Sequence, residues 1–304
     1  MSGPRPLVTS FAVGRLRVHA LEAGLQRLDG GAMFGVVPKP LWEKRIPADA
    51  RNRIPLAMRC LLVEAPSALV LIDTGAGDKE TDKFKDIYGL ENEGDPTALE
   101  DAIRAAGHRP EDVDIVVDTH LHFDHAGGNT RRAPDAVPGE DGHSVGAVPS
   151  FPRARYVVQE KELAFARWDN PRIRASYLPA NYEPVAEAGL FDLVDGEAVV
   201  TEGISVLPTP GHIPHHQSVL IESDGETAIF LGDVCPTSAH VPLPWIMGYD
   251  VEPLTTLDTK TWLWKRAVAE AWTLVFEHDP EVVRARLQGD PGRPELVDVV
   301  RVGG

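Results

Sequence analysis

Residues 115–128 constrain the chain more than any other stretch, because a dense set of metal-binding side chains directly follows a short apolar run. The run Ile115–Val117 has the composition of a short buried strand. Four ligand-competent side chains then lie within residues 120–125, spaced H-x-H-x-D-H: His120, His122, Asp124 and His125. Imidazole and carboxylate at this density suit zinc or another borderline divalent ion. The pattern therefore predicts a metal site in the loop that leaves the strand, in preference to a solvated polar loop.

The same spacing allows two ions. His120 and His122 can turn to one ion, while Asp124 and His125 reach a second ion a few ångströms away. Ala126, Gly127 and Gly128 come next and are expected to open a helix.

Composition bounds the class of protein and its partners. The chain has 304 residues, of which 43% are hydrophobic and 25% charged, as in a soluble globular protein. The net charge is −16 and the sequence pI is near 5.1. An anionic surface argues against nucleic acid and acidic membranes as partners. A small anionic substrate stays compatible, because the charge of bound metal dominates locally.

Cysteine usage and the N-terminal stretch bear on location. Residues 1–6 are not followed by an apolar segment, so no signal peptide is expected. No apolar run approaches the roughly 18 residues of a spanning helix. Cys60 and Cys235 lie in separate apolar contexts and are interpreted as free thiols of a reducing compartment. We therefore expect a cytoplasmic protein, with Cys235 as a metal ligand only a minor alternative.

Hydrophobic patterning predicts strands and helices in the first half of the chain. Strands are expected at 11–24, 56–64, 68–72, 113–118 and 155–159, and helices at 98–106 and 160–168. Thr97 and Glu100 have the spacing of a capping box for the first helix. Strand 68–72, that helix and strand 113–118 form a βαβ unit that delivers the metal loop. Residues 130–152 are expected to be an inserted surface loop, and 169–187 an irregular excursion.

The second half is predicted to be a layer rich in strands. These strands are expected at 189–194, 197–200, 204–208, 217–222 and 227–232, separated by Asp-Gly and Glu-Gly turns. A helix capped by Thr255 or Thr256 should run to about residue 271. A strand at 273–276, a short terminal helix and the segment 296–302 complete the prediction.

Three further ligand-competent residues follow predicted strands. His212 lies in a sharp turn after strand 204–208, Asp233 ends strand 227–232, and His278 follows strand 273–276. Each one alone also fits a turn residue or a strand-end cap. Because strand-end loops gather at one edge of a sheet sandwich, we expect these side chains to converge on the first cluster.

Taken together, these positions resemble the metallo-β-lactamase superfamily. The resemblance extends from Asp73 in an Asp-Thr-Gly turn, through H-x-H-x-D-H, to His212, Asp233 and His278. It implies an α/β fold, a four-layer αββα sandwich of two mixed β-sheets flanked by helices. Residues 1–304 would form a single domain with its metal site between 73 and 278. In this family the Asp of Asp-Thr-Gly braces the metal loop without binding metal.

The resemblance also implies a ligand set and a branch of the family. His120, His122 and His212 would hold one ion, Asp124, His125 and His278 a second, and Asp233 would bridge both. Two divalent ions are therefore expected, with zinc favoured and iron or manganese as alternatives. The bridging aspartate disfavours antibiotic hydrolysis, and the complete H-x-H-x-D-H set disfavours the diiron oxygen-reducing branch. The segment 211–218 resembles the G-H-T-P-G-H-x-S segment of the hydrolase branch, with His215 where glycine is usual and His216 as a buried structural histidine.

The expected chemistry is hydrolysis by a metal-bridging hydroxide, with Asp124 and Asp233 also counted as catalytic. Asp124 would orient the nucleophile or carry a proton. Acyl-homoserine lactonases of this family place a tyrosine three residues after the bridging aspartate, where this chain has Pro236. His240 and Tyr249 are the substitute candidates for protonating the leaving group.

The substrate prediction rests on apolar loops. Residues 32–42 and 241–249 are rich in apolar side chains and favour a small ester or lactone with an apolar tail. A phosphodiester, phosphotriester or thioester substrate is the alternative on the same metals. A mononuclear iron sulfur dioxygenase and a non-catalytic metal sensor are less favoured. Segment 29–46 could be a pocket wall, part of the core or a homodimer contact.

Overall fold

In the computed structural model, which describes residues 5–138 and 144–303, two seven-stranded sheets dominate the fold. The first sheet has the strand order β1-β2-β3-β4-β5-β8-β9. Strands β1 to β4 pair antiparallel, whereas β4, β5, β8 and β9 are parallel, so the sheet is mixed. Its strands are β1 (Val8–Val13), β2 (Leu16–Asp29), β3 (Arg53–Ala65), β4 (Ala68–Ile72), β5 (Ile115–Val117), β8 (Arg155–Gln159) and β9 (Phe191–Val194).

The second sheet runs in sequence order from β10 to β16 and is also mixed, because β13 and β14 are parallel. Its strands are β10 (Ala198–Thr201), β11 (Ile204–Pro208), β12 (Gln217–Ser223), β13 (Glu226–Phe230), β14 (Thr273–Val275), β15 (Val282–Gln288) and β16 (Glu295–Arg301). The prediction that grouped strand 189–194 with this layer was wrong. β9 pairs in parallel with β8 of the first sheet, after a crossover through helices.

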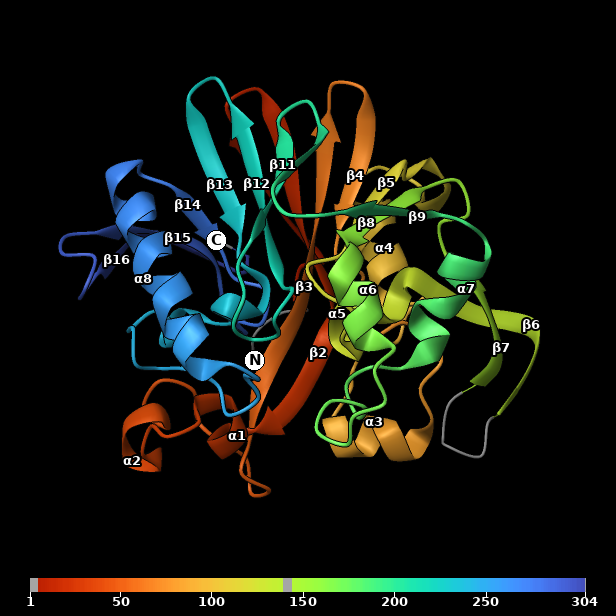
Figure 1. Ribbon diagram of the computed structural model, residues 1–304, viewed down its shortest axis with the longest axis horizontal. Helices are drawn as coiled ribbons and strands as arrows, with labels where there is room; N and C mark the ends of the chain where they lie inside the picture. Colours follow the sequence, from red (N-terminus) through yellow and green to blue (C-terminus); the bar gives the residue numbers. More distant parts are fainter. Residues whose placement is uncertain (1–4, 139–143, 304) are drawn as a thin grey trace.

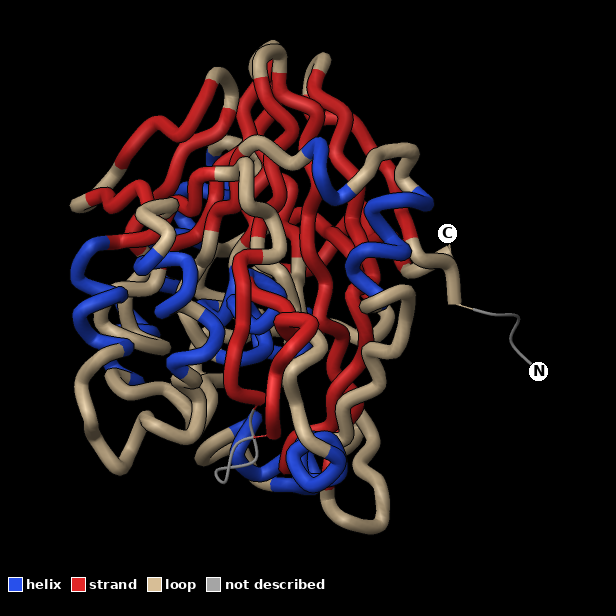
Figure 2. The backbone as a smooth tube through the Cα atoms, turned by 90° about the vertical axis from the view of Figure 1, so that its right-hand side faces the viewer, coloured by secondary structure: helices blue, strands red, loops and turns tan. Residues whose placement is uncertain are grey.

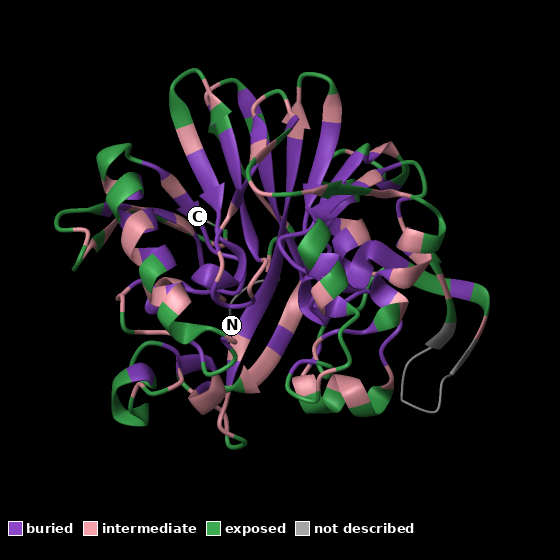
Figure 3. Cartoon of the chain, viewed as in Figure 1, coloured by how far each residue is buried: buried purple, intermediate pink, exposed green. Residues whose placement is uncertain are grey.

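The sheets pack face to face, and helices cover their outer faces (Figure 1). Between the sheets lies an apolar core that includes Val63 and Val117 from the first sheet and Val219 and Phe230 from the second. Figure 2 shows strands filling the middle of the molecule, and Figure 3 shows buried residues concentrated along them. This arrangement confirms the predicted four-layer αββα sandwich of the α/β class.

Helices pack on each outer face. α4 covers the first sheet and α8 the second, each through its apolar side. The α-helices are α1 (Gly30–Phe34), α2 (Lys39–Trp42), α3 (Asp82–Tyr88), α4 (Ala98–Ala105), α5 (Phe123–Ala126), α6 (Glu160–Ala166), α7 (Glu183–Glu187) and α8 (Pro253–Ala269), with 3-10 turns η1 (Pro110–Asp112), η2 (Gly127–Asn129), η3 (Pro179–Asn181), η4 (Gly232–Val234) and η5 (Ser238–His240). Within the described ranges, no helix combines the length and the apolar character needed to cross a membrane.

Local signals at helix ends gave mixed results. Thr97 caps α4 as expected, since its hydroxyl accepts a hydrogen bond from the backbone N–H of Glu100 at 3.3 Å. Helix α8, by contrast, begins at Pro253 with Glu252 as its N-cap, so the prediction of Thr255 or Thr256 was wrong. Proline suits the first helical position because the N–H that it lacks has no partner there.

Three segments differ from their predicted conformation. The expected surface loop 130–152 contains the paired strands β6 (Thr130–Pro138) and β7 (Ser144–Pro149). The expected terminal helix after residue 280 is instead β15, whose alternating Val283, Ala285 and Leu287 are buried. The segment 29–46 carries α1 and α2 and buries Met33, Phe34 and Trp42, so it packs into the core. A homodimer contact there stays a prediction.

Lys260 ties helix α8 to the loop that follows η5. Its buried ammonium donates to the carbonyl oxygens of His240 at 2.6 Å and Trp245 at 2.9 Å, with Pro242 and Leu243 farther away. Burial lowers the pKa of Lys260 to about 8, so the group is still mostly charged at neutral pH. One side chain thus satisfies carbonyls that this non-helical loop cannot satisfy itself.

We predict that Lys260→Met lowers the free energy of unfolding by about 3 kcal/mol, because buried carbonyls lose their donor. Urea denaturation of the purified protein measures this loss. Lys265→Met is the matched control, since Lys265 is exposed on the same helix and should change stability by less than about 0.5 kcal/mol. Equal losses in both variants would contradict the structural role of Lys260.

Candidate metal centre

Strand direction explains why distant residues meet at one edge of the sandwich. β4 and β5 are parallel, so their carboxyl ends place Asp73 beside the loop that starts at Thr119. In the second sheet β11, β13 and β14 run in one direction, because β12 lies antiparallel between β11 and β13. The residues that follow these three strands, His212, Asp233 and His278, therefore come together. The convergence expected from the sequence is observed.

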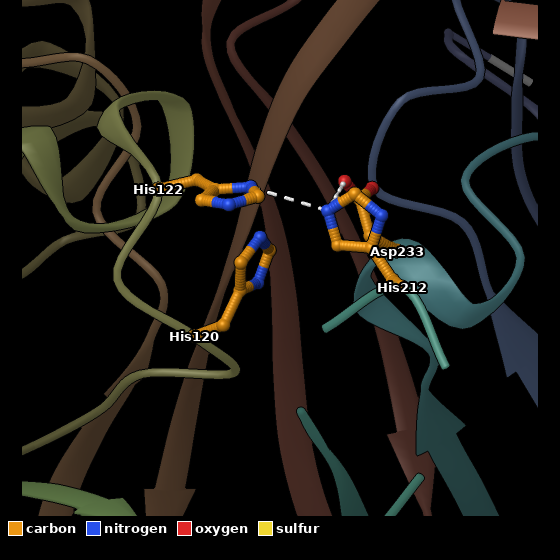
Figure 4. A group of neighbouring side chains, drawn as sticks. All are labelled: His120, His122, His212 and Asp233. Carbon is orange, nitrogen blue, oxygen red and sulfur yellow. Dashed lines mark hydrogen bonds and ion pairs between the residues drawn. The ribbon is translucent and has the colours of Figure 1, made fainter. Parts of the chain in front are cut away.

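The first group of side chains consists of His120, His122, His212 and Asp233, all buried and with one ligand atom of each within 4.8 Å of the others. His120 and His122 project from the loop after β5, and His212 and Asp233 face them from the second sheet (Figure 4). His122 Nδ1 lies 3.1 Å from His212 Nε2, which lies 3.1 Å from an oxygen of Asp233. The Nε2 atom of His120 is buried and has no hydrogen-bond partner among the residues that the structure describes.

The second group consists of Asp124, His125 and His278 and adjoins the first. The Nε2 atoms of His125 and His278 are 3.2 Å apart, and His278 Nε2 lies 3.5 Å from Asp124. Asp233 contacts both groups: Oδ2 lies 3.1 Å from His212 Nε2 and 3.6 Å from His125 Nε2, and Oδ1 lies 3.2 Å from His278 Nε2. Asp233 thus stands between two clusters of potential ligand atoms.

Hydrogen bonds on the outer side of the rings orient the histidines. His212 Nδ1 contacts Asp250 at 3.0 Å, and His278 Nδ1 donates to the carbonyl oxygen of Ala57 at 2.7 Å. Placing the proton on Nδ1 leaves the lone pair of Nε2 directed at the centre, as metal ligation requires. His122 differs, because its Nδ1 is the atom that faces His212.

The histidines of the cluster differ in the direction in which their surroundings shift their pKa values. Burial and the neighbouring imidazoles hold the pKa values of His120 and His122 well below their usual range, so both are neutral. Burial opposes charge on His278 as well, but the carboxylate of Asp233 raises its pKa to about 9. Burial likewise opposes charge on Asp233, but His212 and His278 hold its pKa well below its usual value. A cation bound here would displace protons from histidine and take over the pairing with Asp233.

Two carboxylates share the outer nitrogen of His125. Asp73 Oδ2 lies 2.9 Å from His125 Nδ1, and Glu277 Oε2 lies 3.0 Å from the same atom. Asp73 also accepts hydrogen bonds from the backbone N–H and the hydroxyl of Thr119, both at 2.7 Å. The expectation that Asp73 braces the metal loop is confirmed by these contacts. Burial raises the pKa of Glu277 to about 8.

Sequence reasoning missed several residues that support the site. Glu277 was overlooked. Its position immediately before His278, a predicted ligand, was the signal that could have identified it. Asp250 carried no such signal, because it lies in an irregular loop that follows η5. Gln26 of β2 donates to Asp124 at 2.5 Å, and its place within a long strand gave no hint of this contact.

His216 takes the structural position expected of it. Its Nδ1 lies 2.8 Å from the hydroxyl of Thr209, and its Nε2 accepts a hydrogen bond from the backbone N–H of Asp233 at 3.1 Å. The ring fixes the turn that carries Asp233.

A cavity of about 240 Å³ opens over the two groups. Its polar floor includes His122, Asp124, His212, Asp233 and His278, and its walls include Leu28, Met33, Tyr88, Phe123, Ile173, Met247, Tyr249 and Val251. Burial raises the pKa of Tyr249 to about 12, so its hydroxyl keeps its proton at neutral pH. Tyr88 is a second phenol on the wall that sequence reasoning missed.

His240 does not line this cavity. Its Nε2 lies 2.8 Å from the carbonyl oxygen of Met33 and its Nδ1 lies 2.7 Å from the hydroxyl of Thr237. The ring also stacks on Phe34 with centroids 4.5 Å apart. Both nitrogens are used within the protein, which argues against His240 as the proton donor that the sequence suggested.

Comparison with known proteins agrees with this architecture. N-acyl homoserine lactonase of Bacillus cereus is 29% identical over 188 residues, which span 59% of this chain. The chain thus spans about 64% of the length of that curated relative.

Solved structures share the fold over nearly the whole chain. A probable metal-dependent hydrolase from Staphylococcus aureus superposes with a TM-score of 0.83 at 28% identity, covering 94% of this chain and 98% of that one. The dizinc quorum-quenching lactonase AidC superposes with a TM-score of 0.74 at 17% identity, covering 95% and 96%. Residues 55–278 match the family model of the metallo-beta-lactamase superfamily. That segment contains every residue of both ligand groups, and the chain belongs to the metallo-β-lactamase superfamily.

Proposed function

We propose that the protein is a metal-dependent hydrolase that opens a lactone or cleaves a small carboxylic ester with an apolar tail. The observation that carries the proposal is the position of Asp233, whose carboxylate contacts histidines of both adjoining groups of potential ligands. Such a carboxylate suits two ions a few ångströms apart. The similarity to curated N-acyl homoserine lactonases supports the lactone as the substrate class.

The residues present fit two divalent ions, with zinc favoured by the nitrogen-rich donor set. His120, His122 and His212 would hold one ion; Asp124, His125 and His278 would hold the other; Asp233 would touch both. The buried Nε2 of His120, which has no partner within residues 5–138 and 144–303, fits this assignment, since an uncompensated polar atom in a core is costly. Two ions in such a site lower the pKa of water and polarise a carbonyl oxygen.

The chain itself would orient the reacting groups. Gln26 holds the Asp124 carboxylate in place by its hydrogen bond to Oδ2, which also lies 3.5 Å from His278 Nε2, while Oδ1 lies 3.9 Å from His125 Nε2. Tyr249 on the cavity wall is our candidate for protonating the alkoxide that leaves when a lactone ring opens. This role compensates for Pro236 at the position where acyl-homoserine lactonases carry tyrosine.

The apolar walls favour a substrate with a hydrocarbon tail. Met33, Ile173 and Met247 surround the polar floor of the cavity, so a polar head at the metals and an apolar tail at the wall match its chemistry. A neighbouring groove of about 770 Å³ shares Tyr88 and Ala175 with the cavity and continues over Trp168. A tail longer than the cavity could extend into this groove.

We further propose that residues 1–304 form one domain that acts on small molecules rather than nucleic acid. Cys60 and Cys235 are both buried and unpaired, which fits the reducing cytoplasm proposed as its location.

The direct test is metal content together with turnover. Zinc-loaded protein should carry two ions at this centre and hydrolyse an acyl-homoserine lactone and an aryl ester. Asp233→Ala should lower kcat/KM by about 10³-fold, because both ligand groups lose a shared ligand. Exclusive turnover of a thioester or a phosphodiester in the same panel would overturn the ester and lactone assignment. One iron per chain with oxygen uptake on a persulfide would overturn hydrolysis altogether.

Asp73→Asn should weaken metal affinity by about 10- to 100-fold, since the amide cannot serve His125 and Thr119 as the carboxylate does. Competition with a chromophoric chelator measures the affinity. Asp258→Asn changes an exposed carboxylate on α8 and should leave affinity unchanged. If both variants bound metal like the wild type, Asp73 would not brace the site.

Tyr249→Phe should lower kcat on an alkyl lactone by about 10²-fold, because the leaving alkoxide needs a proton. A nitrophenyl ester should be cleaved at nearly the wild-type rate, since nitrophenolate leaves without one. Tyr88→Phe is the matched control on the same wall. A selective loss in Tyr88→Phe instead would transfer the donor role to Tyr88.

A further inference from the structure

A second cluster of ligand-competent side chains lies outside the catalytic cavity. His19 of β2, Glu64 of β3 and His108 after α4 each offer a ligand atom, and these atoms lie within 4.8 Å of one another. Both His19 Nε2 and His108 Nε2 lie 3.0 Å from the same oxygen of Glu64. None of the three lines the cavity over the metal centre.

Rigid elements hold the three side chains together. His19 faces Leu62 across the β2–β3 ladder, and Glu64 lies two residues farther along on the same face of the sheet. Helix α4 packs on this face and ends in a Schellman motif, with Gly107 at φ +92° and the backbone N–H of His108 bonded to Ile103 O at 3.2 Å. The turn thereby sets His108 over the strands.

The ring nitrogen of His19 that faces away from Glu64 makes a hydrogen bond of the kind that orients metal-binding histidines. Ser10 lies directly opposite His19 on β1, and its hydroxyl is 2.8 Å from His19 Nδ1. When Nδ1 donates to this hydroxyl, the lone pair of Nε2 points toward Glu64 and His108. The His19 side chain is 5% exposed, so this orientation is fixed by packing as well.

The spacing of the ligand atoms fits a tetrahedral ion. Bonds of about 2.0–2.1 Å to nitrogen and oxygen place tetrahedral ligands roughly 3.3 Å apart, and the two N···O separations here are 3.0 Å. The side chains of Glu64 and His108 are 37% and 26% exposed, so water can reach a fourth position.

We propose that His19, Glu64 and His108 form a separate site for one zinc-class divalent ion, which fastens the end of α4 to strands β2 and β3. The ion would be structural, since two histidines, one carboxylate and a solvent ligand join elements that otherwise meet through apolar packing. Without metal, the same atoms form a histidine–carboxylate hydrogen-bond cluster, and this is the competing explanation.

The test compares zinc per chain in full-length wild type and variants after equilibrium dialysis against zinc and removal of free ion. His108→Ala and Glu64→Gln should each hold one equivalent less than the wild type. Glu64→Gln retains an oxygen acceptor while losing the anionic ligand, so it separates metal binding from hydrogen bonding. Arg109→Ala is the control, because it alters the same turn without removing a proposed ligand, and should match the wild type.

Thermal unfolding gives a second readout. Excess zinc should raise the Tm of the wild type and of Arg109→Ala by roughly 5 °C more than that of either ligand variant. All four proteins contain the proposed catalytic centre. The expected difference of one zinc equivalent between the ligand variants and the wild type therefore does not depend on how many ions that centre binds. Equal zinc content and equal Tm response across the four proteins would overturn the proposal and leave a hydrogen-bond cluster.

Discussion

The carboxylate of Asp73 is the constraint on which the metal loop depends. It lies where β4 ends, in a left-handed backbone conformation with φ of +55°, and its own N–H donates to Val117 O of β5 at 2.9 Å. Its Oδ1 accepts the backbone N–H of Thr119, and its Oδ2 contacts both the Thr119 hydroxyl and His125 Nδ1, so the carboxylate holds both ends of the turn that carries the proposed ligands. Because the turn is anchored to two parallel strands, its histidines can be buried without regular structure of their own. The fold and the metal centre therefore share one anchor.

Burying so many ionisable groups is electrostatically unfavourable, and contacts within the protein compensate their charges only in part. Asp73 and Glu277 share one nitrogen of His125, and burial raises the pKa of Glu277. Without metal, the charge of Asp233 is compensated by protonated histidines, whereas metal binding requires these histidines to be neutral. Divalent cations at the centre would neutralise Asp233 and Asp124 while leaving the imidazoles uncharged. The site thus has the charge balance of a metal centre rather than of a set of structural ion pairs.

The sequence predicted the parts of the fold that depend on local pattern. The β-branched run of β5, the capping residue Thr97 and the strand-end positions of the ligand-competent residues were all readable, because each signal lies within a few residues. β9 was assigned to the wrong sheet because strand pairing is decided by contacts remote in sequence. Gln26 and Asp250 were missed for the same reason, since their contacts with ligands join distant segments.

The proposed ligands and the cavity walls belong to different parts of the fold. Residues that would carry out the chemistry are therefore largely distinct from residues that would select the substrate. The proposed ligands follow strand ends, so the sandwich itself determines where they lie. Much of the wall comes from α1, α3 and the loop after η5, and the Lys260 ammonium holds that loop through its carbonyls. Changes in Met33 or Met247 would then reshape the cavity without disturbing the strands that carry Asp233 and His278. A scaffold of this kind would keep its proposed metal chemistry while changes in its loops alter which substrate group reaches the site.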